Sequence, residues 1–311
     1  MDQRANWLKL LTLGVVWGAS FMFSAIALRD FGPMTITAWR LTLAAVVLTA
    51  VVKIMGKSLP SLRDKKGRTI WVIAIILGVI SNAMPFTLLN WGQNFVASGF
   101  AGVSMAIVPL LVLPLAHFLI PGEHMSLRRS SGFVVGFAGV AILIGPEALQ
   151  SSGQGMEFWG RLACVAAAGC YALGMIVTRL CPETDRISLA AAVLISGAVI
   201  IMPLALYVDG VPQSFSALPL LSVVILGLLP TALAQVLMVQ VIRDAGPTFM
   251  TLVNYQVPVW SVVFGILFLA EPVQSSLFLA LALILAGLVL SQLGALHRMI
   301  ASRRKSKLTA E

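Results

Sequence analysis

Ten apolar stretches follow one another along the chain, with only short links between them. They lie at about 7–28, 33–53, 69–91, 97–120, 127–145, 157–179, 187–207, 216–241, 247–270 and 274–295. Apolar runs of about 18 or more residues with few charges predict membrane-spanning helices. Charged residues make up 11% of the chain, against about 25% in ordinary soluble domains. The pattern therefore predicts an all-α integral membrane protein with ten transmembrane helices.

The basic residues indicate how these helices are threaded. If the N-terminus is cytoplasmic, Arg29 and Arg161 are the basic residues placed in outside links, and Arg40 lies within a span. The other Lys and Arg residues of the 21 fall on the cytoplasmic side. Because cytoplasmic loops are enriched in Lys and Arg, both termini are predicted to be cytoplasmic. The net charge of +9 is thus a topology signal, which argues against a nucleic-acid partner.

The chain also carries an internal repeat. A shift of 149 residues places Leu77-Gly78 on Leu226-Gly227 and Pro109 on Pro258, and a shift of 148 places Glu123 on Glu271. We predict two five-helix repeats, 1–145 and 157–296, joined by a periplasmic linker at 146–156 and followed by a basic cytoplasmic tail at 297–311. Because five is odd, the second repeat enters the membrane inverted. Transporters use such repeats and bind substrate between them, near the membrane midplane.

Several segments resemble one family. They are VVWGASFMFSAIAL in the first span, PMTITAWRL in the second, GFAGVSMAIVPLLVLPLAHFLIPGEHMSLRRSSGFVVGFAGVAILIG over the fourth and fifth, and GPTFMTLVNYQVPVWSVVFGILFLAEPVQSSLFLALALILAGLVL over the last two. The ordered set resembles the EamA branch of the drug/metabolite transporter superfamily, and within it the YddG-type amino-acid exporters. The resemblance implies a ten-helix carrier of small metabolites, often an exporter, in the bacterial inner membrane.

The two copies differ most in the ninth span. TLVNYQVPVW (251–260) aligns with GVSMAIVPLL (102–111), so Asn254, Tyr255 and Trp260 replace apolar residues of the first copy. We interpret this gain of polarity as the lining of a substrate cavity. Helical spacing of 100° per residue extends this lining to other spans. The predicted substrate-binding residues are Trp17, Phe21, Asn82, Phe86, Asn90, Tyr171, Met175, Gln235, Met238, Asn254, Tyr255 and Trp260. Packing between helices is the alternative role for each of them.

Four further charged or titratable residues are predicted to act as gates or structural charges. Arg40 lies roughly 10 Å past Pro33 at 1.5 Å per residue, where it either ties helices together or contacts a substrate carboxylate. His117 is either a hydrogen-bonded structural residue or a proton relay. Glu123 and Glu271 end matched spans on opposite sides of the membrane, and the resemblance implies helix-end or gate contacts for them.

The absence of deep carboxylates narrows the expected substrate. A pump for cationic drugs is expected to hold a carboxylate within a span, and a sugar-phosphate carrier several cations. The lining instead suits neutral or zwitterionic solutes, most of all amino acids, including aromatic ones. A lipid or lipid-precursor translocator and a multidrug efflux carrier are the alternatives. The sequence shows no catalytic constellation and no metal-binding spacing, so we expect no enzyme, metal or cofactor. The coupling ion and the oligomeric state stay open, and a monomer fits.

Overall fold

The computed structural model describes residues 3–120, 123, 125–144, 155–272 and 275–308. Helices account for almost all of this part of the chain, and no strand occurs in it. The elements are α1 (Gln3–Ala27), α2 (Pro33–Ile54), α3 (Lys65–Gly78), η1 (Val79–Ala83), α4 (Met84–Gly92), α5 (Ser98–Ser104), η2 (Met105–Ile107), α6 (Val108–Leu119), α7 (Leu127–Ile144), α9 (Met156–Arg179), α10 (Arg186–Val208), α11 (Ala217–Gly227), η3 (Leu228–Leu233), α12 (Ala234–Ala245), α13 (Pro247–Met250), α14 (Val253–Leu269) and α15 (Ser275–Leu308).

Eight helical runs among the described residues are long and apolar enough to cross a membrane. They cover 4–27, 33–54, 65–92, 98–119, 127–144, 156–179, 186–208 and 217–245, and two shorter apolar helices follow at 253–269 and 275–291. These helices begin and end close to the predicted stretches, so the prediction of an all-α, multi-pass membrane protein is confirmed. The predicted linker lies largely outside the described residues, while α15 continues to Leu308 without a break at the predicted start of the tail.

The first residues of several helices show why the chain turns where it does. Asp64 precedes α3 and its carboxylate accepts a hydrogen bond from Gly67 N at 3.0 Å. Asp185 precedes α10 and accepts from the N–H groups of Ile187 and Ser188. Such capping carboxylates satisfy the unpaired N–H groups at a helix start. These two carboxylates therefore help to determine the residues at which α3 and α10 begin.

Two of the long helices contain a π-helical turn that the apolar pattern did not predict. The turn η1 begins at Val79 between α3 and α4, and η3 begins at Leu228 between α11 and α12. The two starts lie 149 residues apart, which equals the shift of the predicted internal repeat. A π-helical turn accommodates one extra residue and is frequent at functional sites. The middle of these two long helices is therefore a candidate location for the functional site.

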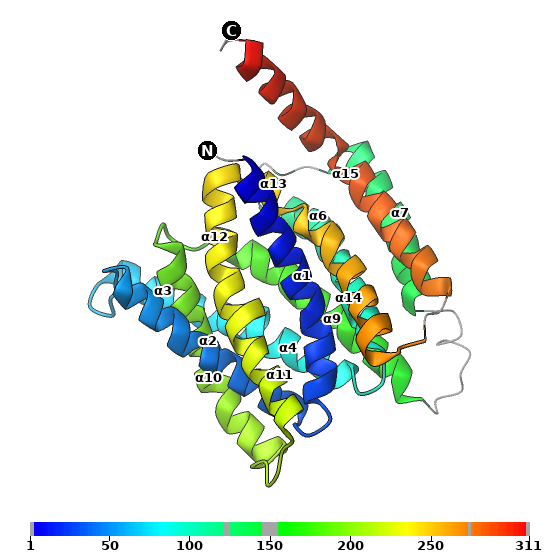
Figure 1. The fold of residues 1–311 in the computed structure, drawn as a ribbon. Helices are drawn as coiled ribbons and strands as arrows, with labels where there is room; N and C mark the ends of the chain where they lie inside the picture. Colours follow the sequence, from blue (N-terminus) through cyan, green and yellow to red (C-terminus); the bar gives the residue numbers. More distant parts are fainter. Residues whose placement is uncertain (1–2, 121–122, 124, 145–154, 273–274, 309–311) are drawn as a thin grey trace.

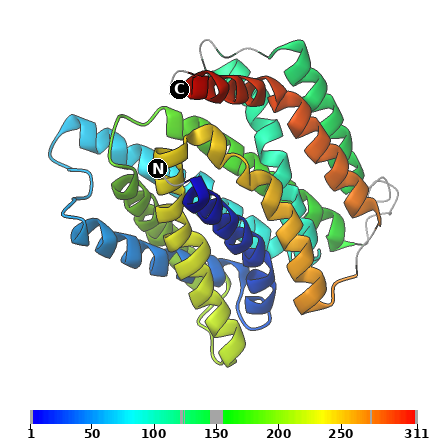
Figure 2. The same ribbon diagram turned by 45° about the horizontal axis from the view of Figure 1, so that its top comes forward.

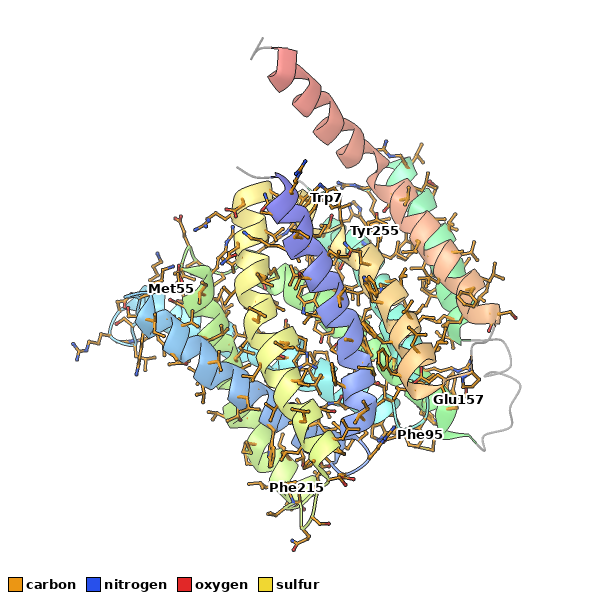
Figure 3. The ribbon with its side chains drawn as sticks, in the orientation of Figure 1. Trp7, Met55, Phe95, Glu157, Phe215 and Tyr255 are labelled. Carbon is orange, nitrogen blue, oxygen red and sulfur yellow. The ribbon has the colours of Figure 1, made fainter. Side chains whose placement is uncertain are left out.

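The helices form one bundle in which segments distant in sequence lie side by side (Figure 1). The tightest pairs are α2 with α10, α7 with α15, α1 with α14, and α4 with α9. The N-terminal end of α1 and the C-terminal end of α15 point to the same side of the bundle in both views (Figures 1 and 2). Trp7 and Tyr255 mark that side, while Phe95, Glu157 and Phe215 lie toward the opposite one (Figure 3).

Glycine allows α7 and α15 to approach until their backbones touch. A Cβ atom added to Gly287 would lie 2.4 Å from the carbonyl oxygen of Gly132 and 2.4 Å from Gly136 N. One added to Gly139 would lie 2.8 Å from the carbonyl oxygen of Ala280. Small residues at such contacts are the usual means of helix association in membranes. The close packing of α7 on α15 therefore requires glycine, which has no side chain, at these positions.

We predict that Gly287→Ala lowers the apparent Tm of the purified protein by several degrees, because overpacking against rigid backbone costs about 1–3 kcal/mol. The matched control is Gly169→Ala in α9, where an added Cβ atom has no neighbour within 4 Å. Thermal unfolding in one detergent measures both. Equal Tm values for the two variants would show that the α7–α15 contact adjusts to an added methyl group without loss of stability.

Candidate functional site

Arg40 of α2 is the buried charge at the centre of the bundle. It is 6% exposed, and its Nε donates a hydrogen bond to Thr231 Oγ1 in η3 at 2.7 Å. The guanidinium also lies over the ring of Phe86 in α4, at 3.7 Å from the ring centroid. A cation–π contact of this kind strengthens when it is shielded from water. These two contacts partly offset the cost of placing a cation within the membrane.

Aromatic side chains from two more helices complete this centre. Tyr171 of α9 meets Phe86 edge-on, with ring centroids 6.3 Å apart. Trp17 of α1 donates its indole N–H to the carbonyl oxygen of Pro230 in η3 at 3.0 Å. We call Trp17, Arg40, Phe86, Tyr171 and Thr231 the central cluster. It unites four predicted site residues with Thr231, which was not among the predicted site residues.

The guanidinium of Arg40 retains hydrogen-bonding capacity. Within the described structure it forms no ion pair, and Nε is its one atom in a hydrogen bond. Arginine presents its donors in a planar fork that matches a carboxylate in two parallel hydrogen bonds. The two terminal nitrogens of Arg40 have no described hydrogen-bond partner and lie beside the ring of Phe86.

Asn90 is a fixed tie between α4 and α2. It is 1% exposed, and its Nδ2 donates to Thr37 Oγ1 at 3.1 Å and to the carbonyl oxygen of Pro33 at 3.3 Å. The Thr37 hydroxyl in turn donates to the same carbonyl at 2.9 Å. These contacts use both donors of the amide, which favours the packing role for this residue.

The other predicted amides have fewer partners. Asn82 donates to the carbonyl oxygen of Leu77 at 3.3 Å, beside the π-helical turn η1. Gln235 and Asn254 are half-buried, and their side chains have no hydrogen bond among the described contacts. Amides without protein partners remain available to a polar ligand. Met238 packs against the core, whereas Met175 is 48% exposed.

The ninth apolar stretch contains a break just before its polar and aromatic residues. The turn at Thr251 and Leu252 separates α13 from α14, and Tyr255 follows it with a buried hydroxyl that lacks a partner. Trp260 stacks on Phe264 at 5.9 Å and lies over Gly18 of α1.

Phe21, also predicted as a binding residue, is 7% exposed in the core beside Gly102 of α5. The structure therefore places Trp260 at the contact between α14 and α1, and Phe21 where α1 meets α5.

Glu271 connects the end of α14 to the start of α5. Its carboxylate accepts hydrogen bonds from Ser98 N at 2.7 Å and Gly99 N at 3.1 Å. A carboxylate at a helix start is favoured both by the free N–H groups and by the helix dipole. This contact closes one end of the bundle.

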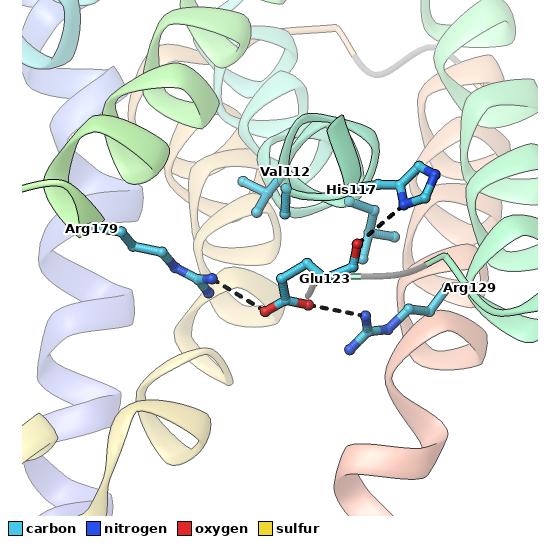
Figure 4. Close-up of a pocket in the computed structure, with 7 residues that line it drawn as sticks. Val112, His117, Glu123, Arg129 and Arg179 are labelled. Carbon is cyan, nitrogen blue, oxygen red and sulfur yellow. Dashed lines mark hydrogen bonds and ion pairs between the residues drawn. The ribbon is translucent and has the colours of Figure 1, made fainter. Parts of the chain in front are cut away.

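Glu123 holds the opposite end, just beyond α6. Its two carboxylate oxygens contact Arg129 of α7 at 3.4 Å and Arg179 of α9 at 3.3 Å (Figure 4). The hydrogen bond from Arg179, followed by that from Arg129, lowers the pKa of Glu123 below its usual value. His117 Nδ1 lies 3.1 Å from the carbonyl oxygen of Glu123.

These groups line a pocket of about 120 Å³, smaller than the roughly 300–1,000 Å³ of ligand sites. The size and the paired charges suit a contact between helices better than a substrate site. In the described part of the chain, no group of three or more His, Cys, Asp or Glu residues could hold a metal ion.

We predict that Asn90→Ala lowers the apparent Tm because it breaks a buried hydrogen bond between helices, worth about 0.6–2 kcal/mol. Thr37→Ala should lower it similarly. The double variant should lose little more than either single variant, because both remove the same contact. Thr12→Ala, whose exposed hydroxyl bonds only its own helix, is the control. Additive losses in thermal unfolding would show that Asn90 and Thr37 stabilise the bundle independently.

Comparisons with known proteins agree with this picture. The model of the EamA-like transporter family matches residues 7–145 and 158–293. A probable terminal-alkyne amino-acid exporter of Streptantibioticus cattleyicolor is 26% identical and aligns over 98% of this chain and 97% of its own length. The transporter YoaV of Bacillus subtilis is 24% identical, over 91% and 95% of the two chains. The inner membrane transporter YedA of Escherichia coli is 26% identical, over 92% and 90%.

A solved crystal structure has the same fold, with a TM-score of 0.65 at 21% identity, covering 93% of this chain and 98% of the other. These relatives are transporters rather than enzymes. Because the family model covers most of the sequence in two stretches, this chain is a member of the EamA-like transporter family.

Proposed function

We propose that this protein is an alternating-access carrier that exports neutral or zwitterionic metabolites, most of all amino acids, including aromatic ones. The observation that carries the proposal is the buried guanidinium of Arg40, which has no acidic partner among the described residues and lies against Phe86. A carboxylate can bind this cation while an apolar side chain packs on Phe86, Tyr171 and Trp17. Such a site suits an amino acid better than a cation.

The architecture behind this proposal is ten spans in two inverted five-helix repeats, with both termini in the cytoplasm of a bacterial inner membrane. Three observations support it. The family model matches two stretches that coincide with the predicted repeats, and η1 and η3 stand 149 residues apart. In addition, α2 contacts α10 and α7 contacts α15, so each of these pairs joins an element to its repeat counterpart.

Alternating access requires a contact that can open at each end of the central cluster. Glu271 in the second repeat binds Ser98 and Gly99 in the first. Glu123 in the first repeat binds Arg179 in the second. Because one contact lies at the start of the α5–α6 run and the other just past its end, they face opposite sides of the membrane. We infer that rocking of the repeats breaks the two contacts in turn.

Amino acids are favoured among the solutes that this site could take. One relative bears the name of a probable terminal-alkyne amino-acid exporter, and an amino acid offers both the carboxylate and the side chain that the central cluster can bind. Gln235 and Asn254, with no described side-chain hydrogen bonds, could receive the ammonium group or the polar atoms of the substrate.

Counterflow into proteoliposomes tests the proposal directly. The panel holds the twenty amino acids, a nucleoside, a sugar phosphate and a quaternary ammonium drug. We expect accumulation of neutral amino acids with competition by phenylalanine, and at least ten-fold weaker competition by phenylalaninamide, which lacks the carboxylate. Arg40→Gln should reduce this discrimination and Arg40→Lys should retain part of it. Equal competition by the acid and the amide in the wild-type protein would refute the role of Arg40.

We also predict that Gln235→Ala and Asn254→Ala raise the KM for the transported amino acid about five- to ten-fold, since a lost hydrogen bond is worth about 1–1.5 kcal/mol. Their apparent Tm should stay unchanged, because neither side chain has a described protein partner. Thr12→Ala is the control for both measurements. If the two variants transport at the wild-type rate when expressed at the same level, the side chains of Gln235 and Asn254 only pack between helices.

A further inference from the structure

An apolar groove runs along the outer surface of the α2–α10 pair, away from the central cluster. It is open to the surroundings of the bundle and has a volume of about 470 Å³. Val46 of α2 and Val199 of α10 form its ridges and are 65% and 68% exposed. The small side chains of Ala45 and Ala198 form its base. A groove of this size on a membrane-facing surface has room for an elongated apolar ligand.

The walls of the groove are apolar although two threonines line it. Thr42 Oγ1 donates to the carbonyl oxygen of Ala38 at 2.8 Å, and Thr49 Oγ1 donates to that of Ala45 at 2.7 Å. These bonds within α2 satisfy both hydroxyls, so the side chains have no donor left for the groove. The lining therefore suits a hydrocarbon chain.

The groove is closed behind. Leu41, Ala44 and Leu48 of α2 are fully buried, and they pack against Ala191 and Leu194 of α10 in one hydrophobic cluster. A ligand in the groove consequently has no path between these helices to Arg40. The groove is therefore separate from the proposed transport site. It also lacks the opening between helices through which a lipid translocator would admit its substrate.

A single basic residue lies at one end of the groove. Lys53, in the last turn of α2, lines it, is exposed, and forms no ion pair in the described part of the chain. Its neighbour Lys57 is instead paired with Asp185. Lys53 thus offers an uncompensated cation at the point where the apolar lining ends.

The length of the groove matches half a bilayer. From Thr42 to Lys53, α2 rises by about 16 Å at 1.5 Å per residue, and the hydrocarbon core of a bilayer is about 30 Å thick. An acyl chain whose headgroup lies at Lys53 would therefore reach the membrane midplane. We propose that the α2–α10 groove is a binding site for an anionic glycerophospholipid, with one acyl chain in the groove and the phosphate on Lys53.

Native mass spectrometry of the full-length protein in a non-ionic detergent tests this site, with phosphatidylglycerol and phosphatidylcholine of identical chains as probes. We expect one phosphatidylglycerol to bind more tightly than phosphatidylcholine. Lys53→Gln should weaken phosphatidylglycerol binding about five-fold, as expected for one surface cation. Lys66→Gln, an exposed residue outside the groove, should leave it unchanged.

A second variant tests the apolar part of the groove. Ala50 lines the groove from an exposed position, so Ala50→Phe should fill it without disturbing the core. We expect this variant to keep the wild-type Tm in detergent and to lose tight binding of phosphatidylglycerol. Equal binding of the two lipids, equal losses in Lys53→Gln and Lys66→Gln, or a dimer that forms in place of the lipid complex would overturn the proposal.

Discussion

The arrangement of α2, α4 and η3 depends on how the bundle stabilises the buried positive charge of Arg40. A guanidinium within the membrane is costly unless protein groups replace its water. Thr231 supplies a hydroxyl and Phe86 supplies an aromatic face, so one side chain links α2, η3 and α4. Thr231 can do so because its own hydroxyl also donates to the carbonyl oxygen of Leu226 at 2.8 Å. The π-helical turn η3 thereby joins the charge to the helix that carries Gln235.

The two π-helical turns and the glycine contacts have complementary effects. In hydrocarbon every backbone group needs a partner, and Trp17 provides one for the carbonyl oxygen of Pro230. At each π-helical turn a side chain hydrogen-bonds a backbone carbonyl: Trp17 donates to Pro230 at η3, and Asn82 donates to Leu77 beside η1. Away from the centre, the backbone contact between Gly132 and Gly287 holds regular helices together.

The sequence predicted the helices well because length and polarity alone decide what crosses a membrane. Helical spacing also placed Phe86 and Tyr171 on inward faces, but it did not predict that Phe86 lies under the guanidinium of Arg40 with Tyr171 beside it. It did not predict η1, η3 or the break at Thr251, because one extra residue in a turn leaves the apolar pattern intact. Nor could it separate Asn90 from Gln235. Both are amides within spans, and only the contacts to Thr37 and Pro33 distinguish them.

The two contacts that we propose as gates differ in strength, and this difference bears on which end of the proposed carrier opens. Glu271 accepts two backbone N–H groups, and hydrogen bonds to a charged group are worth about 1.5–3 kcal/mol each. Glu123 is 35% exposed and Arg179 is 55% exposed, and surface ion pairs contribute only about 0–1 kcal/mol. In the proposed repeat, Pro247 replaces Ser98 and lacks the N–H that Glu123 would need for a matching cap. Under the proposed mechanism, the end at Glu123 is therefore the less costly one to open, and by the predicted topology it faces the cytoplasm, where an exporter would take up its substrate.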